Sequence, residues 1–333
     1  MRRSSLFRDI MPSPSIIVTR SLPAPVEAVL RDRYGAVLSP DDRQLSREEL
    51  GRALDTYDIV LCTLTDRLDA ELIERPTRRA VFLANFGAGT NHIDLAACRR
   101  VGLPVSNTPG VLTEDTADLT ILLMLAIARR AWEGDQELRA GRWTGWRPTH
   151  LLGTRVSGKS LGIVGMGRIG RAVAQRARFG FGMSVHYWSR TRLPLADEAT
   201  LEAQWHPTLD ALLASTEFVS VHCPATPETR HLINAHTLAA MRPGAYLVNT
   251  SRGDVVDEAA LLDALGGGHL GGAALDVFDG EPQVNPALLA HPRIVTLPHL
   301  GSATVESRVA MGERAIANIA AWLAGAPLPD RVA

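Results

Sequence analysis

Short runs of β-branched and other apolar residues alternate along the whole chain with segments in which apolar residues recur at helical spacing. Leu209–Ala214 and Glu258–Leu265 are examples of the helical segments. Because strands and helices alternate, the pattern predicts parallel sheets built from βαβ units, an α/β fold. The predicted strands are Ser15–Thr19, Asp58–Cys62, Ala80–Ala84, Leu161–Val164, Ser184–Trp188, Phe218–His222, Tyr246–Asn249, Gly272–Val277 and Ile294–Leu297.

Two further helical segments bear on the domain organisation. Thr113–Arg129 begins with a threonine followed by Glu114 and Asp115, residue types that favour a helix N-terminus. The segment continues as a nearly all-apolar helix, which must be buried, for example between domains or subunits. A final helix, Val305–Leu323, follows the last predicted strand. It can pack back on the N-terminal half, which would make that domain discontinuous.

The composition narrows the class of protein. With 333 residues, the chain is long enough for two domains and a large core. Its net charge of -1 and its 46% of hydrophobic residues are typical of a soluble globular protein and give no sign of a surface for nucleic acid or anionic membranes. Lys159, in a Ser-Gly-Lys-Ser turn, is the only lysine, which argues against Schiff-base chemistry.

Cysteine usage and the start of the chain bear on its location. Cys62, Cys98 and Cys223 lie far apart and match no zinc or disulfide spacing, so we expect no metal site and a reducing compartment. The apolar run at residues 121–128 is much shorter than the roughly 20 residues of a membrane span. Residues 1–14 lack the apolar region of a signal peptide, and we interpret them as a flexible leader with Met11 as an alternative start. A cytoplasmic protein is expected.

A glycine-rich turn is the clearest functional motif. Leu161–Val164 leads into Gly165-Met-Gly167-Arg-Ile-Gly170, and helical residues follow. Glycines at a strand-to-helix turn let the helix N-terminal amides and dipole face a pyrophosphate, so the motif predicts a nicotinamide dinucleotide site. Gly266–Gly271 also fits the GxGxxG pattern, but a strand-like segment follows it. We therefore interpret the second copy as a packing turn.

The residues after the next strand predict which dinucleotide binds. About 20 residues beyond the glycines, an acid would bind the ribose 2′-hydroxyl, but the chain has Ser189-Arg190-Thr191-Arg192 there. Hydroxyls and arginines suit a 2′-phosphate, so the sequence predicts NADPH as the preferred cofactor, with NADH secondary. The alternative interpretation is a solvated basic loop.

Three residues late in the chain form a candidate catalytic set. Arg252, Glu281 and His299 each follow a predicted strand, and the carboxyl ends of parallel strands share one edge of a sheet. Arginine can bind a 2-oxo acid through two parallel hydrogen bonds. A histidine can protonate the carbonyl oxygen during hydride transfer, and a carboxylate partner favours its charged form. Asp276 is expected to orient the nicotinamide amide.

Each of these residues also has an ordinary structural interpretation. A single histidine after a strand is more often a satisfied structural histidine, Arg252 could form a surface ion pair, and Glu281 could begin a helix. Their joint occurrence after a dinucleotide motif favours the catalytic interpretation.

From about Ser15 to its end, the chain resembles the D-2-hydroxyacid dehydrogenase family. Besides Gly165–Gly170, the motifs that carry the resemblance are Pro224–Thr229, Asn249–Asp254, Leu275–Phe278, Glu281-Pro282 and Pro298–Ser302. Trp188–Thr191 and Arg139–Trp146 are most similar to the glyoxylate/hydroxypyruvate reductase branch.

The resemblance implies two Rossmann-like, doubly wound domains and a homodimer formed through the cofactor domain. On this basis the substrate domain comprises residues 15–111 and 300–333, and the NAD(P)-binding domain comprises residues 112–299. Arg252, Glu281 and His299 match the catalytic residues of the family, and either Trp143 or Trp146 is a candidate to reach the neighbouring subunit's site. The resemblance also implies substrate contacts at Leu64, Ala88, Gly89, Arg252 and His299. The predicted cofactor contacts are Gly165, Gly167, Arg168, Ile169, Gly170, Ser189, Arg190, Thr191, Cys223, Pro224, Thr229, Thr250, Ser251, Asp276 and Gly301.

Departures from related branches narrow the expected activity. The chain ends soon after Leu323, so we expect no regulatory domain like that of many phosphoglycerate dehydrogenases, and residues 61–65 contain no cation to meet a substrate phosphate. A histidine paired with Glu281 differs from the glutamine pairing of formate dehydrogenases. We expect an NADPH-preferring reductase of glyoxylate or hydroxypyruvate. A reductase of a bulkier 2-oxo acid, such as 2-ketogluconate or a phenylpyruvate-like acid, and a dinucleotide-sensing protein similar to the family's corepressors are the alternatives.

Overall fold

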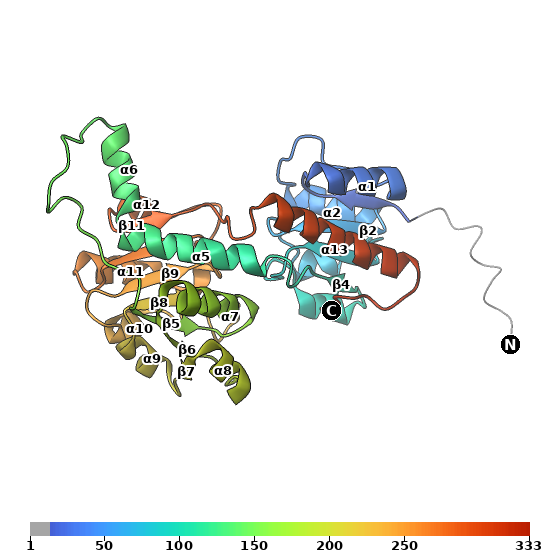
Figure 1. Ribbon diagram of the computed structural model, residues 1–333. Helices are drawn as coiled ribbons and strands as arrows, with labels where there is room; N and C mark the ends of the chain where they lie inside the picture. The colour runs from blue at the N-terminus through green and yellow to red at the C-terminus, as the bar shows by residue number, and fades with distance from the viewer. Residues whose placement is uncertain (1–13) are drawn as a thin grey trace, which may run out of the picture. The chain divides into compact units, whose positions relative to one another are not determined.

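The computed structural model describes residues 14–333, and the chain divides into two compact units. Unit 1 contains the chain up to Leu112 together with Thr304–Ala333, and unit 2 contains Thr113–Ala303. The colours in Figure 1 make the division visible, because the blue and red ends of the chain share one unit. The boundaries expected from sequence, after residue 111 and before residue 300, lie close to these divisions. Most of the expected leader, residues 1–13, lies outside the described residues.

The sheet of unit 1 is parallel throughout. Its strands are β1 (Ile16–Val18), β2 (Ile59–Thr63), β3 (Phe82–Phe86) and β4 (Val105–Ser106), hydrogen-bonded in that order. Val37 extends the edge beyond β1 through a parallel bridge to Ile17. Val37 follows β1 in the chain and lies on the outer side of β1 in the sheet. If Val37 is counted as a second strand and the later strands are renumbered, the strand order is 2-1-3-4-5, the order of flavodoxin-like doubly wound folds.

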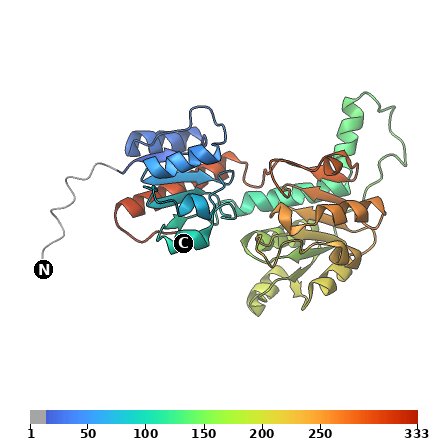
Figure 2. The same cartoon turned by 180° about the vertical axis from the view of Figure 1, so that it is seen from behind.

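Helices cover both faces of this sheet. One face carries α1 (Ala24–Tyr34) and the C-terminal helix α13 (Val305–Leu323), whose Met311, Ala315 and Ile319 join the core. The other face carries α2 (Arg47–Thr56), α3 (Ala70–Ile73) and α4 (Leu95–Arg100). Both ribbon views show α13 in red beside the blue N-terminal elements (Figures 1 and 2). The last helix of the chain therefore belongs to the same unit as the first strands.

Unit 2 has the strand order of a dinucleotide-binding Rossmann fold. Its parallel strands run in the order β11-β10-β9-β8-β5-β6-β7. The order reverses between β5 and β8, and ligands of such sheets bind at the carboxyl ends beside this switch point. The strands are β5 (Ser160–Val164), β6 (Ser184–Trp188), β7 (Ala203–Trp205), β8 (Phe218–Val221), β9 (Tyr246–Asn249), β10 (Gly272–Leu275) and β11 (Ile294–Thr296).

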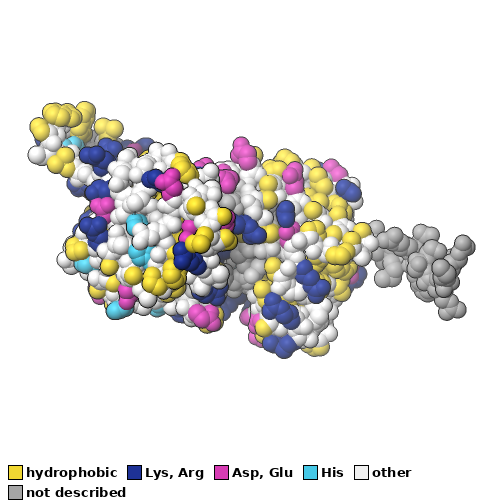
Figure 3. Space-filling model, turned by 60° about the horizontal axis from the view of Figure 1, so that its bottom comes forward, with side chains coloured by type: hydrophobic (Ala, Val, Ile, Leu, Met, Phe, Trp, Pro, Cys, Tyr) yellow, Lys and Arg dark blue, Asp and Glu magenta, His cyan; other side chains and the backbone are white. Residues whose placement is uncertain are grey.

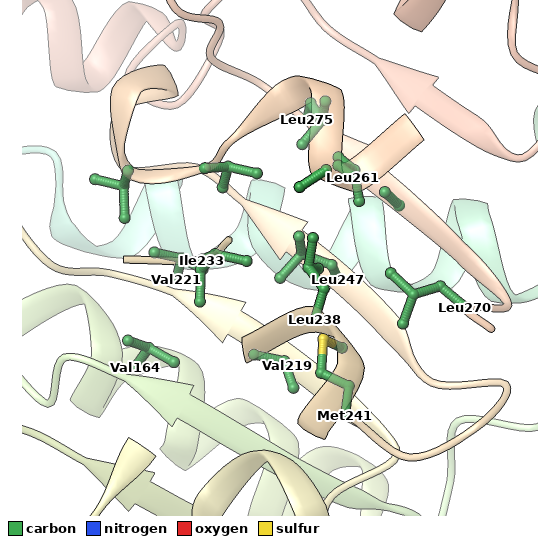
Figure 4. Close-up of a cluster of buried hydrophobic side chains, with 14 of the residues drawn as sticks. Val164, Val219, Val221, Ile233, Leu238, Met241, Leu247, Leu261, Leu270 and Leu275 are labelled. Atoms are coloured by element: carbon green, nitrogen blue, oxygen red, sulfur yellow. The ribbon is translucent and has the colours of Figure 1, made fainter. Parts of the chain in front are cut away.

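The helices of unit 2 form two layers around the sheet. One layer contains α9 (Leu209–Ser215), α10 (Ala235–Ala240), α11 (Glu258–Gly266) and α12 (Pro286–Ala290). Figure 4 shows the apolar cluster beneath this layer, where Leu238, Leu247 and Leu261 meet. The opposite layer contains α5 (Thr113–Ala128), α7 (Arg168–Gln175) and α8 (Leu195–Leu201). Apolar side chains cover both faces of the unit 2 sheet. This explains why its strands appear in the sequence as short continuous apolar runs.

The apolar helix α5 packs on the unit 2 sheet against β9, β10 and β11. Ala117, Leu123, Met124 and Ala128 are buried there, whereas Leu122 is 55% exposed. The single chain therefore buries one face of the helix, and the expected burial of the rest against another domain or subunit stays a prediction. No helix in residues 14–333 combines the length and apolar character needed to span a bilayer.

Two short strands were not predicted from sequence. β4 has two residues and β7 has three, Ala203-Gln-Trp205. Neither is long enough to give a recognisable alternation, and only pairing with a neighbouring strand defines it.

Candidate active site

The glycine-rich turn connects β5 to α7, and its close contacts explain two of its glycines. Gly165 has a φ of +100°, and a Cβ atom there would lie 2.8 Å from the amide nitrogen of Cys223. A Cβ atom on Gly170 would lie 2.3 Å from the Gly165 carbonyl oxygen. Only glycine lets the turn pack against the chain leaving β8 and lets α7 approach the turn this closely.

The N-terminus of α7 is open to a ligand. A Cβ atom on Gly167 would meet no atom within 4 Å, and no side chain caps the helix. The first amides of an α-helix have no partner within the helix and carry the positive end of its dipole. Arg168, Ile169 and Gly170 supply these amides. The residues present therefore fit the pyrophosphate of a dinucleotide.

The loop after β6 presents a cation where an acid would bind a ribose hydroxyl. Arg190 is exposed and has no hydrogen bond or ion pair to another residue in the described part of the chain. Ser189 donates its hydroxyl to the carbonyl oxygen of Thr191 at 2.5 Å, so these two residues close a tight turn around Arg190.

The segment after β8 is closed by a threonine. Thr229 donates its hydroxyl to the carbonyl oxygen of Pro224 at 2.7 Å and accepts the Thr226 amide at 2.8 Å. Cys223 is buried, and burial raises the pKa of its thiol to about 11. Its thiol is therefore not a nucleophile, and the segment serves as a wall beside the glycine-rich turn.

Asn249 organises the turn that carries Arg252. Its side-chain oxygen accepts the amide and hydroxyl of Ser251, at 3.0 and 2.8 Å, and its amide nitrogen donates to the Arg252 carbonyl oxygen at 2.8 Å. Thr250 hydrogen-bonds to Thr120 of α5 through the two hydroxyls at 2.9 Å. Asn249 belongs to a predicted motif, but no role was predicted for it. Its position at the last residue of a buried strand was the available signal.

Gly253 brings two loops into contact. A Cβ atom on Gly253 would lie 1.8 Å from the carbonyl carbon of Phe278. The turn with Arg252 is thus pressed against the segment that leads to Glu281. Burial lowers the pKa of Arg252, and the charges of Glu281 and Asp254 oppose that shift. An arginine in this setting stays charged over the working pH range.

His299 and Glu281 form the closest pair of candidate residues. Nδ1 of His299 lies 2.8 Å from a carboxylate oxygen of Glu281, whose other oxygen accepts the Phe278 amide at 2.8 Å. Burial would raise the pKa of Glu281, but the hydrogen bond and charge of His299, the Phe278 amide and Arg252 together lower it. Within residues 14–333, Nε2 of His299 has no hydrogen-bond partner. The ring is therefore oriented by a carboxylate, with its second nitrogen available.

Asp276 holds the backbone on which His299 sits. Its two carboxylate oxygens accept the amides of Leu300 and Gly301, at 2.6 and 2.8 Å, and its carbonyl oxygen accepts the His299 amide at 2.9 Å. Thr116 donates to the Gly301 carbonyl oxygen at 2.9 Å. Burial raises the pKa of Asp276 to about 6, against the effect of these amides. No sequence pattern pointed to Thr116, and the predicted contact of Asp276 with the nicotinamide amide stays a prediction.

The substrate contacts implied for unit 1 lie at the ends of its strands. Leu64 follows β2 and is 38% exposed. Asn85 donates to the carbonyl oxygens of Gly87 and Gly89, at 3.0 and 2.9 Å, and Asn107 donates to that of Ala88 at 2.7 Å. With its carbonyl groups bound, the loop leaves the amides of Ala88 and Gly89 without partners among the described residues. Such a pair of amides can bind a carboxylate.

In unit 2, every predicted cofactor or catalytic residue follows the carboxyl end of a strand. His299 is hydrogen-bonded to Glu281 through its ring. Asp276 accepts hydrogen bonds from the backbone amides of His299 and Leu300, so the three predicted residues lie together. Arg252 lies near them but makes its side-chain hydrogen bond to its neighbour Ser251, at 2.6 Å. A cation, a carboxylate and a histidine at the edge of a dinucleotide-binding sheet can bind and protonate a carbonyl compound.

The fold and this set of groups define a nicotinamide-dinucleotide-binding oxidoreductase, and comparison with known proteins gives the family. Residues 121–301 match the family model of the D-isomer specific 2-hydroxyacid dehydrogenase, NAD binding domain. A glyoxylate reductase from Thermococcus litoralis is 41% identical, over 96% of this chain and 96% of that protein. A glycerate dehydrogenase from Hyphomicrobium methylovorum is 37% identical, over 96% and 98%.

A solved structure agrees with these relatives. The crystal structure of NADPH-dependent glyoxylate/hydroxypyruvate reductase from Sinorhizobium meliloti in complex with NADP and malonate has a TM-score of 0.83 and 33% identity, with 97% of each chain covered. The chain belongs to the D-isomer specific 2-hydroxyacid dehydrogenase family. It is an enzyme that uses a nicotinamide dinucleotide in the interconversion of 2-oxo and 2-hydroxy acids.

Replacing Gly253 with alanine tests the contact between the two loops. We expect Gly253→Ala to lower kcat/KM by about 10²-fold, because a displacement near 1 Å of Arg252 or Glu281 has an effect of that size. Gly266→Ala is the matched control, since a Cβ atom there meets nothing within 4 Å. Initial rates and thermal melting of both variants give the comparison. Full activity of Gly253→Ala would show that the site does not depend on this contact.

Proposed function

We propose that the enzyme is an NADPH-preferring reductase of small 2-oxo acids, with glyoxylate or hydroxypyruvate as substrate. The observation that carries the proposal is the pairing of His299 Nδ1 with Glu281 at 2.8 Å, which leaves Nε2 as a proton donor. The names of the relatives, glyoxylate reductase and glycerate dehydrogenase, support a small substrate.

His299 protonates the carbonyl oxygen in the proposed reaction. NADPH, when bound, supplies the hydride that adds to the carbonyl carbon of the 2-oxo acid. The negative charge that develops on the oxygen is neutralised by the proton from Nε2 of His299, which gives the 2-hydroxy acid. Glu281 fixes the orientation of the ring through this hydrogen bond, and the lowered pKa of Glu281 keeps its own carboxylate ionised. Glu281 is thus an orienting partner, while the proton itself comes from the imidazole.

Arg252 of unit 2 is a substrate ligand in this proposal, and the loop at Ala88 and Gly89 is a candidate carboxylate site of unit 1. The guanidinium of Arg252 forms hydrogen bonds to the carboxylate and carbonyl groups of the 2-oxo acid. The amides of Ala88 and Gly89, which have no partner among the described residues, are proposed to donate hydrogen bonds to a substrate carboxylate, and Leu64 is proposed as a further substrate contact. The charges of Glu281 and Asp254 offset the burial of Arg252, which supports a charged guanidinium.

The preference for NADPH follows from the loop after β6. An exposed, unpaired Arg190 between two hydroxyl-bearing residues suits a 2′-phosphate, and no carboxylate in this loop would bind a 2′-hydroxyl instead. The Sinorhizobium meliloti structure with bound NADP supports the same preference. NADH is proposed as the weaker cofactor. A cytoplasmic location, which matches the supply of reduced cofactor, is proposed from the sequence.

We also propose a homodimer in which an arm of unit 2 contacts the second copy. The arm comprises α6 (Ala131–Arg139) and the following residues up to 155. None of the residues of α6 is buried, and Trp132, Leu138 and Trp146 are 53%, 62% and 82% exposed. Figure 3 shows hydrophobic side chains gathered on the projecting arm at the upper left. Apolar surface of this kind is stable when another surface covers it.

Substitution of His299 tests the proton donor. We expect His299→Gln to lower kcat by about 10²–10⁴-fold with little change in the KM for NADPH, because general acid catalysis contributes on this scale. His236→Gln is a control, since His236 is exposed and pairs with Asp210 at 3.0 Å. Steady-state rates with glyoxylate and hydroxypyruvate provide the measurement. Unchanged kcat in His299→Gln would remove this residue from the mechanism.

Cofactor and substrate choice are tested together. We expect Arg190→Ala to raise the KM for NADPH by at least about tenfold and to change the KM for NADH little, since only NADPH has the phosphate. A panel of glyoxylate, hydroxypyruvate, pyruvate, phenylpyruvate and 2-ketogluconate with wild-type enzyme identifies the substrate. Equal effects on both cofactors would contradict the role of Arg190. Turnover of only the bulky acids would contradict the small substrate, and binding of NADPH without turnover would indicate a sensor.

The molar mass in solution tests the homodimer. Light scattering is expected to give twice the 36.0 kDa of the chain. A charge in the arm, Leu138→Arg, should shift the enzyme toward the monomer, whereas Leu195→Arg, at a residue that is 69% exposed outside the arm, should not. A wild-type mass of a single chain would contradict the proposal.

A further inference from the structure

We propose that Arg192, although it lies beside the 2′-phosphate position in sequence, is a positioning residue rather than a phosphate ligand. Together with Glu198 and Tyr187 it fixes the loop that presents Arg190. The inference rests on the proposed NADPH preference and concerns how this chain achieves it.

The guanidinium of Arg192 pairs with a carboxylate along one edge and lies over an aromatic ring with one face. Its Nε and one terminal nitrogen donate to the two carboxylate oxygens of Glu198, each at 2.8 Å. The same group lies over the ring of Trp205, 5.2 Å from the ring centre. A two-point pair with a carboxylate and stacking on an aromatic ring are the geometries that arginine forms most favourably. Arg190, two residues earlier, has neither contact.

Glu198 is a buried carboxylate whose charge Arg192 compensates. It is 8% exposed and accepts the hydroxyl of Tyr187, which is fully buried, at 2.5 Å. The hydrogen bonds from Arg192 and then Tyr187 lower the pKa of Glu198 to about 2. Burial and the bond to Glu198 raise the pKa of Tyr187 to about 12. A buried carboxylate without its cation is costly, so the pair resists separation.

The same network fixes the backbone of the loop. The amide of Leu193 donates to the Tyr187 hydroxyl at 2.8 Å, and the side chain of Leu193 is buried. On the other side of Arg190, Ser189 bonds to the Thr191 carbonyl oxygen. The loop is therefore held at both ends, by β6 and by α8, with Arg190 between the two attachments. A cation fixed in this way loses less conformational entropy when it binds a phosphate.

The two possible roles of Arg192 predict opposite effects of removing Glu198. If Arg192 is a phosphate ligand, Glu198→Gln frees it and removes a nearby negative charge, so a 2′-phosphate binds more tightly. If Arg192 positions the loop, the same change loosens the loop and the 2′-phosphate binds more weakly. The sign of the change therefore decides between the roles.

The experiment measures binding of adenosine 2′,5′-bisphosphate and adenosine 5′-monophosphate by calorimetry, with NADPH and NADH kinetics alongside. For Glu198→Gln we expect the Kd of the bisphosphate to rise about tenfold. The Kd of the monophosphate should change by less than about twofold. Asp197→Asn is the matched control, because Asp197 is also on α8 but pairs with Arg171 of α7 at 2.7 Å. Unchanged or tighter binding of the bisphosphate to Glu198→Gln, or an equal loss in Asp197→Asn, would overturn the proposal.

Two further variants keep the test valid if Glu198→Gln folds poorly. Tyr187→Phe removes only the hydroxyl that joins Glu198 to the Leu193 amide, and we expect a selective loss of bisphosphate affinity of a few-fold. Arg192→Lys keeps the charge but not the two-point geometry. A positioning role predicts a selective loss in Arg192→Lys as well, and full retention of selectivity in both variants would contradict it.

Failure of this inference can be distinguished from failure of the NADPH preference through Arg190→Ala. Suppose that Arg190→Ala selectively weakens binding of the bisphosphate and that Glu198→Gln does not. This result would support the NADPH preference and contradict the positioning role of Arg192. If wild-type enzyme binds the bisphosphate no more tightly than the monophosphate, the NADPH preference is wrong and the positioning role falls with it.

Discussion

The candidate active site depends on the hydrogen bonds that Asp276 accepts from the segment after β11. His299 has a φ of +57°, a left-handed conformation that costs a non-glycine residue about 1–3 kcal/mol. The amides of His299, Leu300 and Gly301 all donate to Asp276, and Thr116 binds the Gly301 carbonyl oxygen. These contacts hold the imidazole where Glu281 can reach its Nδ1 atom. The strain is thus compensated by a buried carboxylate from the neighbouring strand.

Three arginines show how surroundings give one residue type different roles. Arg252 is charged in a largely buried turn, where Glu281 and Asp254 offset the cost of burial. Arg192 is committed to Glu198 and Trp205, whereas Arg190 remains exposed and unpaired among the described residues. A chain with a single lysine relies on this residue type for nearly all of its positive charge. Geometry, not composition, distinguishes the proposed substrate ligand, the residue proposed to position the loop and the proposed phosphate ligand.

Much of the fold could be predicted because its cause is local. The strands of unit 2 are short apolar runs, and the helix Val305–Leu323 was predicted with the bounds that α13 has in the structure. The glycines at 165, 167 and 170 form a strand-to-helix turn, as expected. β4 and β7 were missed, since a strand of two or three residues exists only through its pairing. The apolar character of α5 predicted a buried helix, and its residues Ala117, Leu123, Met124 and Ala128 are buried in the core of unit 2.

The α/β class, the dinucleotide turn and the residue types available for catalysis can be recognised in the amino-acid sequence, because they follow from periodicity and from motifs within a few residues of one another. Three features depend on the folded arrangement: which of the two arginines after β6 is free, the support that Thr116 and Asp276 give to the loop of His299, and the contact that Gly253 makes between two loops. Glu198 follows Arg192 by six residues, Thr116 precedes Gly301 by 185, and Phe278 follows Gly253 at a distance along the chain that no local pattern spans. The contacts of Thr116 with Gly301 and of Gly253 with Phe278 exist only after folding has brought these distant segments together at the edge of the sheet.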